Sequence, residues 1–157
     1  MKIVILYSGG LDSYIMRHYA KTKFPNADIK CVYCDIGQPV AKKEIELLPS
    51  FVEVRKVDWM DEENSTRSQP GRREGPIMIP GRNMVFAVLA SSIYLPDKIW
   101  LGALHGETHS KGTDKNYIFL EKCNNLVNYV NGPFKNGSPI DIEFPLADAK
   151  LDKLGEF

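Results

Sequence analysis

The sequence predicts an α/β protein: a doubly wound, five-stranded parallel sheet with helices on both faces. Three observations support this fold class. Apolar β-prone runs alternate with helical segments, the first run ends in a Gly-Gly pair, and polar loops follow several of the runs. Strands that alternate with helices imply right-handed crossovers between parallel strands. In such sheets ligands bind beyond the carboxyl ends of the strands, where the strand order reverses.

Each element follows from its local pattern. The first strand is a continuous β-prone run, typical of a strand buried on both faces. The five expected strands are Lys2–Tyr7, Ile29–Asp35, Phe51–Val57, Lys98–Leu104 and Ile140–Phe144. Helices are expected at Ser13–Lys23, Pro39–Leu48, Gly81–Tyr94 and Lys115–Val130, with a last one from Asp148 onward.

The length of 157 residues suits one domain, which we expect to span residues 1–157. A long polar loop is predicted at 61–79, with its most charged part at Asp61–Pro76. Loops of this length in compact domains are usually functional or disordered.

Composition excludes several classes of function. The chain has 20 basic and 20 acidic residues, so its formal net charge is zero. A neutral chain has no long-range field to attract phosphate backbones, which argues against nucleic acid as the main partner. No apolar run approaches the roughly 20 residues that span a bilayer, and the N-terminus lacks a secretory pattern. With an odd number of cysteines as well, the sequence predicts a cytoplasmic protein without membrane contact.

The segment Cys31-Val32-Tyr33-Cys34 has the spacing of half a zinc site. It lies in a predicted strand, where residues three apart point to opposite faces. A complete site would also need two further ligands, and only Cys123 and the histidines are available. We therefore expect buried structural thiols and no zinc.

The strongest functional signal is Ser8-Gly9-Gly10-Leu11-Asp12-Ser13, directly after the first strand. A strand that turns into a helix offers unpaired N–H groups and the positive end of the helix dipole to an anion. Glycines allow a close approach of the backbone, and the serines add hydroxyl donors. Asp12 beside phosphates makes sense as a Mg²⁺ ligand. The alternative is a plain strand–helix turn that uses its glycines for geometry only.

This segment resembles the signature of the N-type ATP pyrophosphatases, the PP-loop superfamily. The resemblance implies an adenine nucleotide alpha-hydrolase-like fold and ATP bound by Ser8, Gly9, Gly10, Leu11, Asp12, Ser13 and Gly102. It also implies cleavage of ATP between its α- and β-phosphates, with Mg²⁺, and adenylation of a substrate oxygen.

Further segments resemble the 7-cyano-7-deazaguanine synthase family: Asp35-Ile36-Gly37-Gln38, Pro80-Gly81-Arg82-Asn83, Gly102 with the loop ending at Asp114, and Phe144-Pro145-Leu146 followed by Lys150. This resemblance implies a ligase that converts a deazapurine-like acid with ammonia towards the nitrile. It assigns catalysis to Asp12, Arg82 and Asp114, and substrate binding to Gln38, Arg82, Asn83, Glu107, Asp114 and Lys150. A homodimer is compatible with it.

Each of these residues also has a plainer interpretation. Arg82 has a planar fork of donors suited to phosphate or carboxylate, and Asn83 can bind an amide or a base edge. Alternatively, the two belong to a helix start with a surface arginine. Glu107 and Asp114 can bind Mg²⁺ or a purine ring, or can be solvated loop acids. His105 and His109 are candidate acid–base groups or solvated side chains.

The chain ends at Phe157, before the four zinc-binding cysteines that usually close the deazaguanine family. This departure keeps two alternatives open. One is a shortened, non-catalytic nucleotide-binding relative. The other is a PP-loop enzyme that acts on another nucleobase or on RNA.

Overall fold

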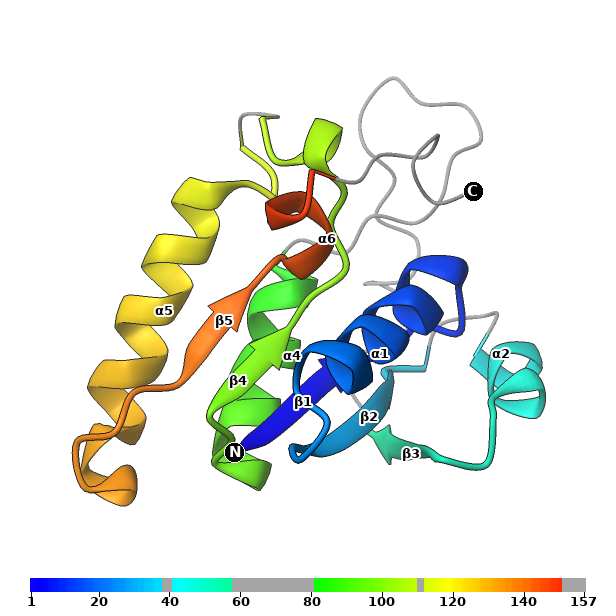
Figure 1. Cartoon of the computed structure of the whole chain (residues 1–157), viewed down its shortest axis with the longest axis horizontal. Coiled ribbons are helices and arrows are strands. Elements are labelled where there is room, and N and C mark those ends of the chain that lie inside the picture. The colour runs from blue at the N-terminus through cyan, green and yellow to red at the C-terminus, as the bar shows by residue number, and fades with distance from the viewer. Residues whose placement is uncertain (38–40, 58–80, 110–111, 151–157) are drawn as a thin grey trace.

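The computed structural model describes residues 1–37, 41–57, 81–109 and 112–150. They form one parallel sheet of five strands in the order β3-β2-β1-β4-β5 (Figure 1). The strands are β1 (Lys2–Leu6), β2 (Asp28–Asp35), β3 (Val52–Lys56), β4 (Lys98–Trp100) and β5 (Asp141–Glu143). The predicted fold class is confirmed.

Helices cover both faces of the sheet, as Figure 1 shows, with α1 on one face and α4 and α5 on the other. The α-helices are α1 (Leu11–Lys23), α2 (Ala41–Leu47), α4 (Arg82–Tyr94), α5 (Tyr117–Asn131) and α6 (Pro145–Asp148). Two short 3₁₀ helices are η1 (His105–Glu107) and η2 (Gly132–Lys135).

The central strand β1 divides the core into two layers. Ile3 and Ile5 pack with α1, whereas Val4 between them packs with α4 and α5. All three side chains are fully buried. Because successive side chains of a strand point to opposite faces, a continuous apolar run serves both layers at once. Burying each such side chain contributes about 1.5–3 kcal/mol, which anchors β1 between its neighbours.

The strand order reverses beside β1. Ile5 of β1 is paired with Cys31 of β2 on one side and with Trp100 of β4 on the other. The chain first runs outward through β2 to β3, and then crosses β1 to build β4 and β5. The switch point therefore lies between β1 and β4, at whose carboxyl ends a ligand site is expected.

Several predicted boundaries differ from the observed ones. The fourth strand stops at Trp100, and Leu101–Leu104 continue as irregular chain. The helix expected from Asp148 onward was wrong, because Asp148 is the last residue of α6. Pro145 starts this helix earlier, since a proline fits the first helical turn. Residues 61–79 lie outside the described part of the chain. No described helix is both long and apolar enough to cross a membrane.

Candidate functional site

The turn after β1 presents an uncapped helix start. The backbone N–H of Tyr7 still donates to Val32 in the sheet, at 2.8 Å. The chain then reverses at Gly9, whose φ of +83° favours glycine, and α1 begins after Gly10. In the described chain no side chain caps this helix start, and residues 8–10 are exposed. The first N–H groups of α1 thus face the solvent beside the positive end of the helix dipole, which suits an anion.

Two serines clasp this turn. The Ser13 hydroxyl accepts a hydrogen bond from the Ser8 backbone N–H at 2.9 Å, and the two hydroxyl oxygens lie 2.9 Å apart. Ser13 is buried, whereas Ser8 is exposed. Ser13 therefore fixes the shape of the turn from within, and the exposed Ser8 hydroxyl also accepts the Gly10 backbone N–H at 3.4 Å.

The end of β4 lies against the first turn of α1. A Cβ atom at Gly102 would lie 3.9 Å from the Asp12 Cβ and 3.6 Å from the Met16 Cε. The two segments that the sequence assigned to ATP are thus neighbours at the switch point.

Within Ser8–Ser13, the carboxylate is that of Asp12. Among the residues that the structure describes, no group of three or more His, Cys, Asp or Glu side chains is placed to hold a metal ion. Mg²⁺ in nucleotide enzymes is commonly held by one or two carboxylates together with the phosphates of the substrate. A single half-buried aspartate beside the turn at Gly9 and Gly10 fits that requirement.

The start of α4 is tied to the loop before α5. The Asn83 backbone N–H donates to the Asp114 carboxylate at 3.1 Å, and the Asn83 side-chain amide donates to the Asp114 backbone carbonyl at 3.1 Å. Asn83 is buried. Arg82, the first residue of α4, is exposed and forms no hydrogen bond or ion pair with the described residues. Of the three, Arg82 is the one presented to a ligand.

The loop after β4 is internally braced. One carboxylate oxygen of Glu107 accepts from the Leu104 backbone N–H at 3.0 Å, and the other is 2.8 Å from the Lys115 ammonium. The Thr108 hydroxyl donates to the His105 carbonyl at 2.8 Å. Glu107 therefore links Leu104 to Lys115 within this loop, and its contact with a substrate stays a prediction.

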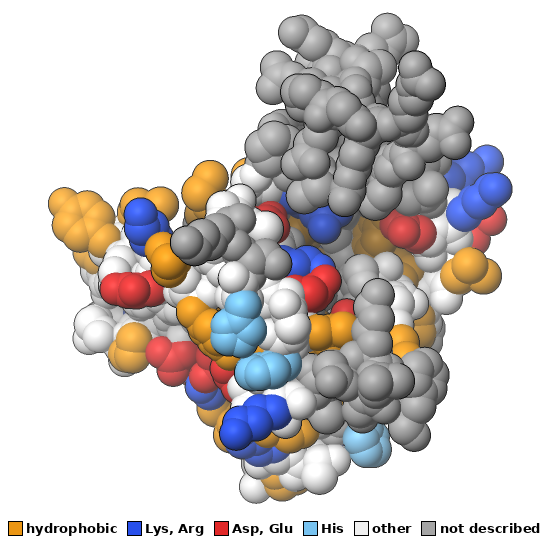
Figure 2. Space-filling model, turned by 90° about the horizontal axis from the view of Figure 1, so that it is seen from above, with side chains coloured by type: hydrophobic (Ala, Val, Ile, Leu, Met, Phe, Trp, Pro, Cys, Tyr) orange, Lys and Arg blue, Asp and Glu red, His pale blue; other side chains and the backbone are white. Residues whose placement is uncertain are grey.

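Figure 2 looks onto this edge of the sheet and shows two histidine side chains next to each other, with acidic and basic side chains close by. They are His105 and His109, whose ring centroids lie 5.2 Å apart in an edge-to-face arrangement. Both are exposed. The structure thus leaves their role open to either an acid–base function or solvation.

Of the remaining residues from the sequence motifs, Asp35 and Lys150 are described by the structure and Gln38 is not. Asp35 is the last residue of β2, and its carboxylate accepts the Gly37 backbone N–H at 3.0 Å, which forms a tight turn at the carboxyl edge. Lys150 is exposed just after α6, and α6 contacts both η1 and α1 at the same edge. Gln38 lies outside the described residues.

The two strand cysteines point to opposite faces, as predicted. Cys31 packs in the layer of α1, and Cys34 packs against the layer of α4 and α5. Burial raises the pKa of each thiol, and that of Cys123, to about 11. These groups therefore stay protonated at neutral pH, as expected for structural thiols.

Sequence reasoning missed Lys115 and Thr108, which brace the loop after β4. Lys115 lies eight residues from Glu107 in irregular chain. No periodicity pairs such residues, so only their opposite charges could have suggested the contact.

Comparisons with known proteins show the fold. No protein-family model and no curated protein sequence matches the chain. A predicted subunit of a tRNA methyltransferase from Methanocaldococcus jannaschii is similar over 99% of this chain and 73% of its own, with 15% identity and a TM-score of 0.62. The U34-tRNA thiolase NcsA from Methanococcus maripaludis, solved with its [4Fe-4S] cluster, is similar over 99% of this chain, with 16% identity and a TM-score of 0.52.

The chain spans only 54% of the length of the thiolase. At these identities the likeness concerns the fold alone, an adenine nucleotide alpha-hydrolase-like fold. It gives no support to the 7-cyano-7-deazaguanine synthase family in particular.

Proposed function

We propose that the chain is an ATP-dependent enzyme of the PP-loop type that adenylates a nucleobase of tRNA and releases pyrophosphate. The uncapped turn at Gly9 and Gly10 carries this proposal, because it combines exposed N–H groups, a helix start and the switch point of the sheet. Such a combination suits the two outer phosphates of ATP.

The chain's own residues would act mainly by position and charge. The N–H groups at the start of α1 and the exposed Ser8 hydroxyl would bind the β- and γ-phosphates. Asp12 would hold Mg²⁺, which when bound supplies neutralisation of phosphate charge. Arg82 would orient the second substrate through its guanidinium, which forms no hydrogen bond or ion pair with the described residues. Holding two reactants in line and neutralising developing charge can supply most of the rate enhancement in phosphorus chemistry.

The choice of tRNA rests on the two structural neighbours, both of which are described as acting on tRNA or as part of a tRNA-modifying enzyme. It replaces the expectation that a chain of zero net charge does not bind nucleic acid. Net charge describes only the long-range field, and a local contact to one base or phosphate does not require it.

A second candidate is the conversion of a deazapurine-like acid with ammonia towards its nitrile. The turn at Asp35–Gly37 and the exposed Arg82 at the start of α4 favour it, since a guanidinium suits a carboxylate. A free carboxylate needs the same adenylation step as a tRNA base. The two candidates therefore share the ATP site and differ only in the second substrate.

Pyrophosphate release distinguishes these functions. The protein would be incubated with ATP and Mg²⁺ alone, with unmodified tRNA, and with 7-carboxy-7-deazaguanine plus ammonium. We expect release with tRNA, and loss of that release in Asp12→Ala. Release only with the deazapurine acid would select the second candidate. Tight ATP binding without release in any arm would overturn the enzyme assignment in favour of a non-catalytic nucleotide-binding protein.

A further inference from the structure

Two imidazoles meet at the carboxyl edge of the sheet, in the loop after β4. His105 is the first residue of η1, and Thr108, directly after η1, keeps right-handed helical φ and ψ angles of −71° and −12°. Residues 105–109 thus make about one helical turn, which places His105 and His109 on the same side of it. Both side chains are exposed, and Figure 2 shows two imidazole side chains next to each other on this surface.

Neither imidazole ring forms a hydrogen bond or an ion pair with another described residue. The bond between His105 and Thr108 uses the His105 backbone carbonyl, which accepts from the Thr108 hydroxyl at 2.8 Å. A neutral imidazole has one ring nitrogen with a lone pair, and this makes histidine the commonest metal ligand. Each of the two side chains therefore has a nitrogen available for a ligand.

The spacing of the two rings fits chelation of one ion. Their centroids lie 5.2 Å apart, with an interplanar angle of 88°. Zn²⁺ binds a histidine nitrogen at about 2.0–2.1 Å, which places the ion ~3.2 Å from the centroid of the ring. Two rings on a tetrahedral Zn²⁺ therefore have centroids ~5.2 Å apart, whereas adjacent ligands of an octahedral ion have them ~4.5 Å apart. Rotation about χ2, which has a broad energy well, turns each ring about an axis through its centroid, so both nitrogens can turn towards one ion at an unchanged separation.

The backbone beneath the two rings is braced by neighbouring segments. Glu107, between the histidines, accepts from the Leu104 backbone N–H at 3.0 Å and pairs with the Lys115 ammonium at 2.8 Å. Thr108 is buried, and α6 packs against η1. A turn that is already fixed loses little conformational freedom when it binds a ligand, which favours affinity.

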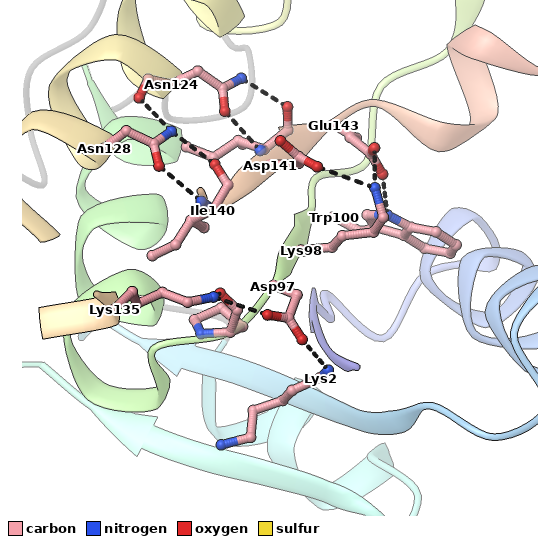
Figure 3. A network of polar contacts seen from close by, with 12 residues as sticks. Lys2, Asp97, Lys98, Trp100, Asn124, Asn128, Lys135, Ile140, Asp141 and Glu143 are labelled. Atoms are coloured by element: carbon pink, nitrogen blue, oxygen red, sulfur yellow. Dashed lines mark hydrogen bonds and ion pairs between the residues drawn. The ribbon is translucent and has the colours of Figure 1, made fainter. Parts of the chain in front are cut away.

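Lys115 lies just before α5, and this helix is itself held to the sheet, as Figure 3 shows. Asn128 donates to the Ile140 carbonyl at 2.9 Å and accepts the Ile140 N–H at 2.7 Å. Asn124 makes the same pair of bonds with Ile142. The two amides thus occupy the outer edge of β5 as a neighbouring strand would. The loop with the histidines is therefore attached to a helix that is fixed on the sheet.

We propose that His105 and His109 chelate one Zn²⁺ ion at this edge of the sheet. Imidazole nitrogen suits Zn²⁺, whereas Mg²⁺ prefers oxygen ligands. No group of three or more His, Cys, Asp or Glu side chains in the described chain is placed to hold a metal ion, so water completes the coordination. Such a two-ligand site binds Zn²⁺ more weakly than the three- and four-ligand sites of zinc enzymes and zinc fingers. It shares no residue with the Mg²⁺ position proposed at Asp12.

The test is a titration of the nucleotide-free protein with ZnCl₂, in which NMR follows the ring protons of the three histidines. We expect the signals of His105 and His109 to shift together and to saturate at one equivalent. The signals of His18, which is exposed on α1, should stay in place. Mg²⁺ should shift none of the three, and calorimetry would give the affinity for Zn²⁺.

Substitutions identify the ligands. His105→Ala and His109→Ala should each lower zinc affinity at least about tenfold, since even changes to the groups that orient a metal ligand have that effect. The matched control is His18→Ala, which should leave the affinity unchanged, and circular dichroism would confirm that the variants fold. The absence of a saturable shift in the natural chain, or an equal response to Mg²⁺, overturns the proposal. Zinc affinity that survives both substitutions, or that His18→Ala abolishes, assigns the ion to other residues and also overturns it.

Discussion

Asp114 and Asn83 hold each other through two hydrogen bonds of 3.1 Å, which join the first turn of α4 to the loop before α5. The carboxylate caps a helix whose own N-cap residue, Gly81, has no side chain. The negative charge also lies at the positive end of the α4 dipole. The two residues thus fix the start of α4, whose first residue is the exposed Arg82.

Asp114→Ala should destabilise the protein by about 1 kcal/mol, the usual cost of removing a helix cap. Asp114→Asn keeps an acceptor oxygen, so it should lose less stability than Asp114→Ala. Urea denaturation of the two variants measures the difference. Equal stability of Asp114→Ala and the natural chain would show that the bond to the Asn83 N–H is dispensable.

The two turn glycines should respond differently to alanine. Gly9 has a φ of +83°, so Gly9→Ala should cost on the order of 1–2 kcal/mol of stability. Gly10 has a φ of −81°, and a Cβ there would lie 3.5 Å from the Ser8 hydroxyl, an ordinary contact. Gly10→Ala should therefore fold normally.

The same Gly10→Ala protein tests the phosphate site. The added methyl group would lie at the open start of α1, so ATP affinity should fall at least about tenfold, or ~1.4 kcal/mol. Titration calorimetry measures it, with thermal denaturation as the check on folding. Unchanged ATP affinity in folded Gly10→Ala would show that the phosphates of ATP do not bind at this turn.

The amides at the edge of β5 allow a matched comparison on one helix. Asn128→Ala leaves the N–H and carbonyl of Ile140 without their side-chain partner, which should cost on the order of 1–3 kcal/mol. Asn125→Ala, on the exposed side of α5, should change stability by less than about 0.5 kcal/mol. Chemical denaturation gives both values. Similar losses would mean that the asparagines act through helix propensity rather than through the strand edge.

Local pattern was enough to predict the fold. In β1, Val4 faces one layer of helices and its neighbours face the other. A strand that is apolar on both faces predicts a sheet covered by helices on both sides. The turn at Gly9 follows directly from that strand. Contacts between distant segments have no local sequence pattern that predicts them. Asp114 and Asn83, for example, are 31 residues apart.

The sequence did not indicate the internal partners of Glu107 and Asn83, which the resemblance assigned to the substrate. In the structure these two side chains bind Lys115 and Asp114, and their contact with a substrate stays a prediction. A polar side chain in a loop pairs with whichever group the tertiary structure brings within reach, and the local sequence does not specify that group.

Stability should fall at high pH because of the buried thiols. Burial raises the pKa of Cys31 from its ordinary value of 9.0 to about 11. The folded state holds the thiol proton more tightly than the unfolded state does. The stabilisation is therefore complete below about pH 9 and is lost as the pH rises through 11. Urea denaturation at pH 8 and pH 10.5 checks the direction, and Cys31→Ala should show a weaker dependence than the natural chain.

Arg82→Ala is the sharpest test of the second-substrate site. Arg82 is exposed at the start of α4 and contacts no other described residue by hydrogen bond or ion pair, so its removal should leave folding intact. We expect ATP affinity within a few fold of the natural value. Substrate-dependent pyrophosphate release should fall by an amount equivalent to about 2–5 kcal/mol, the usual loss when a charged contact is removed. Arg82→Lys keeps the charge without the planar fork and should recover only part of the rate. Titration calorimetry with ATP, followed by the release assay with tRNA and with the deazapurine acid, separates the two effects. Loss of ATP binding itself would place Arg82 in the nucleotide site, and unchanged release with both substrates would remove it from catalysis.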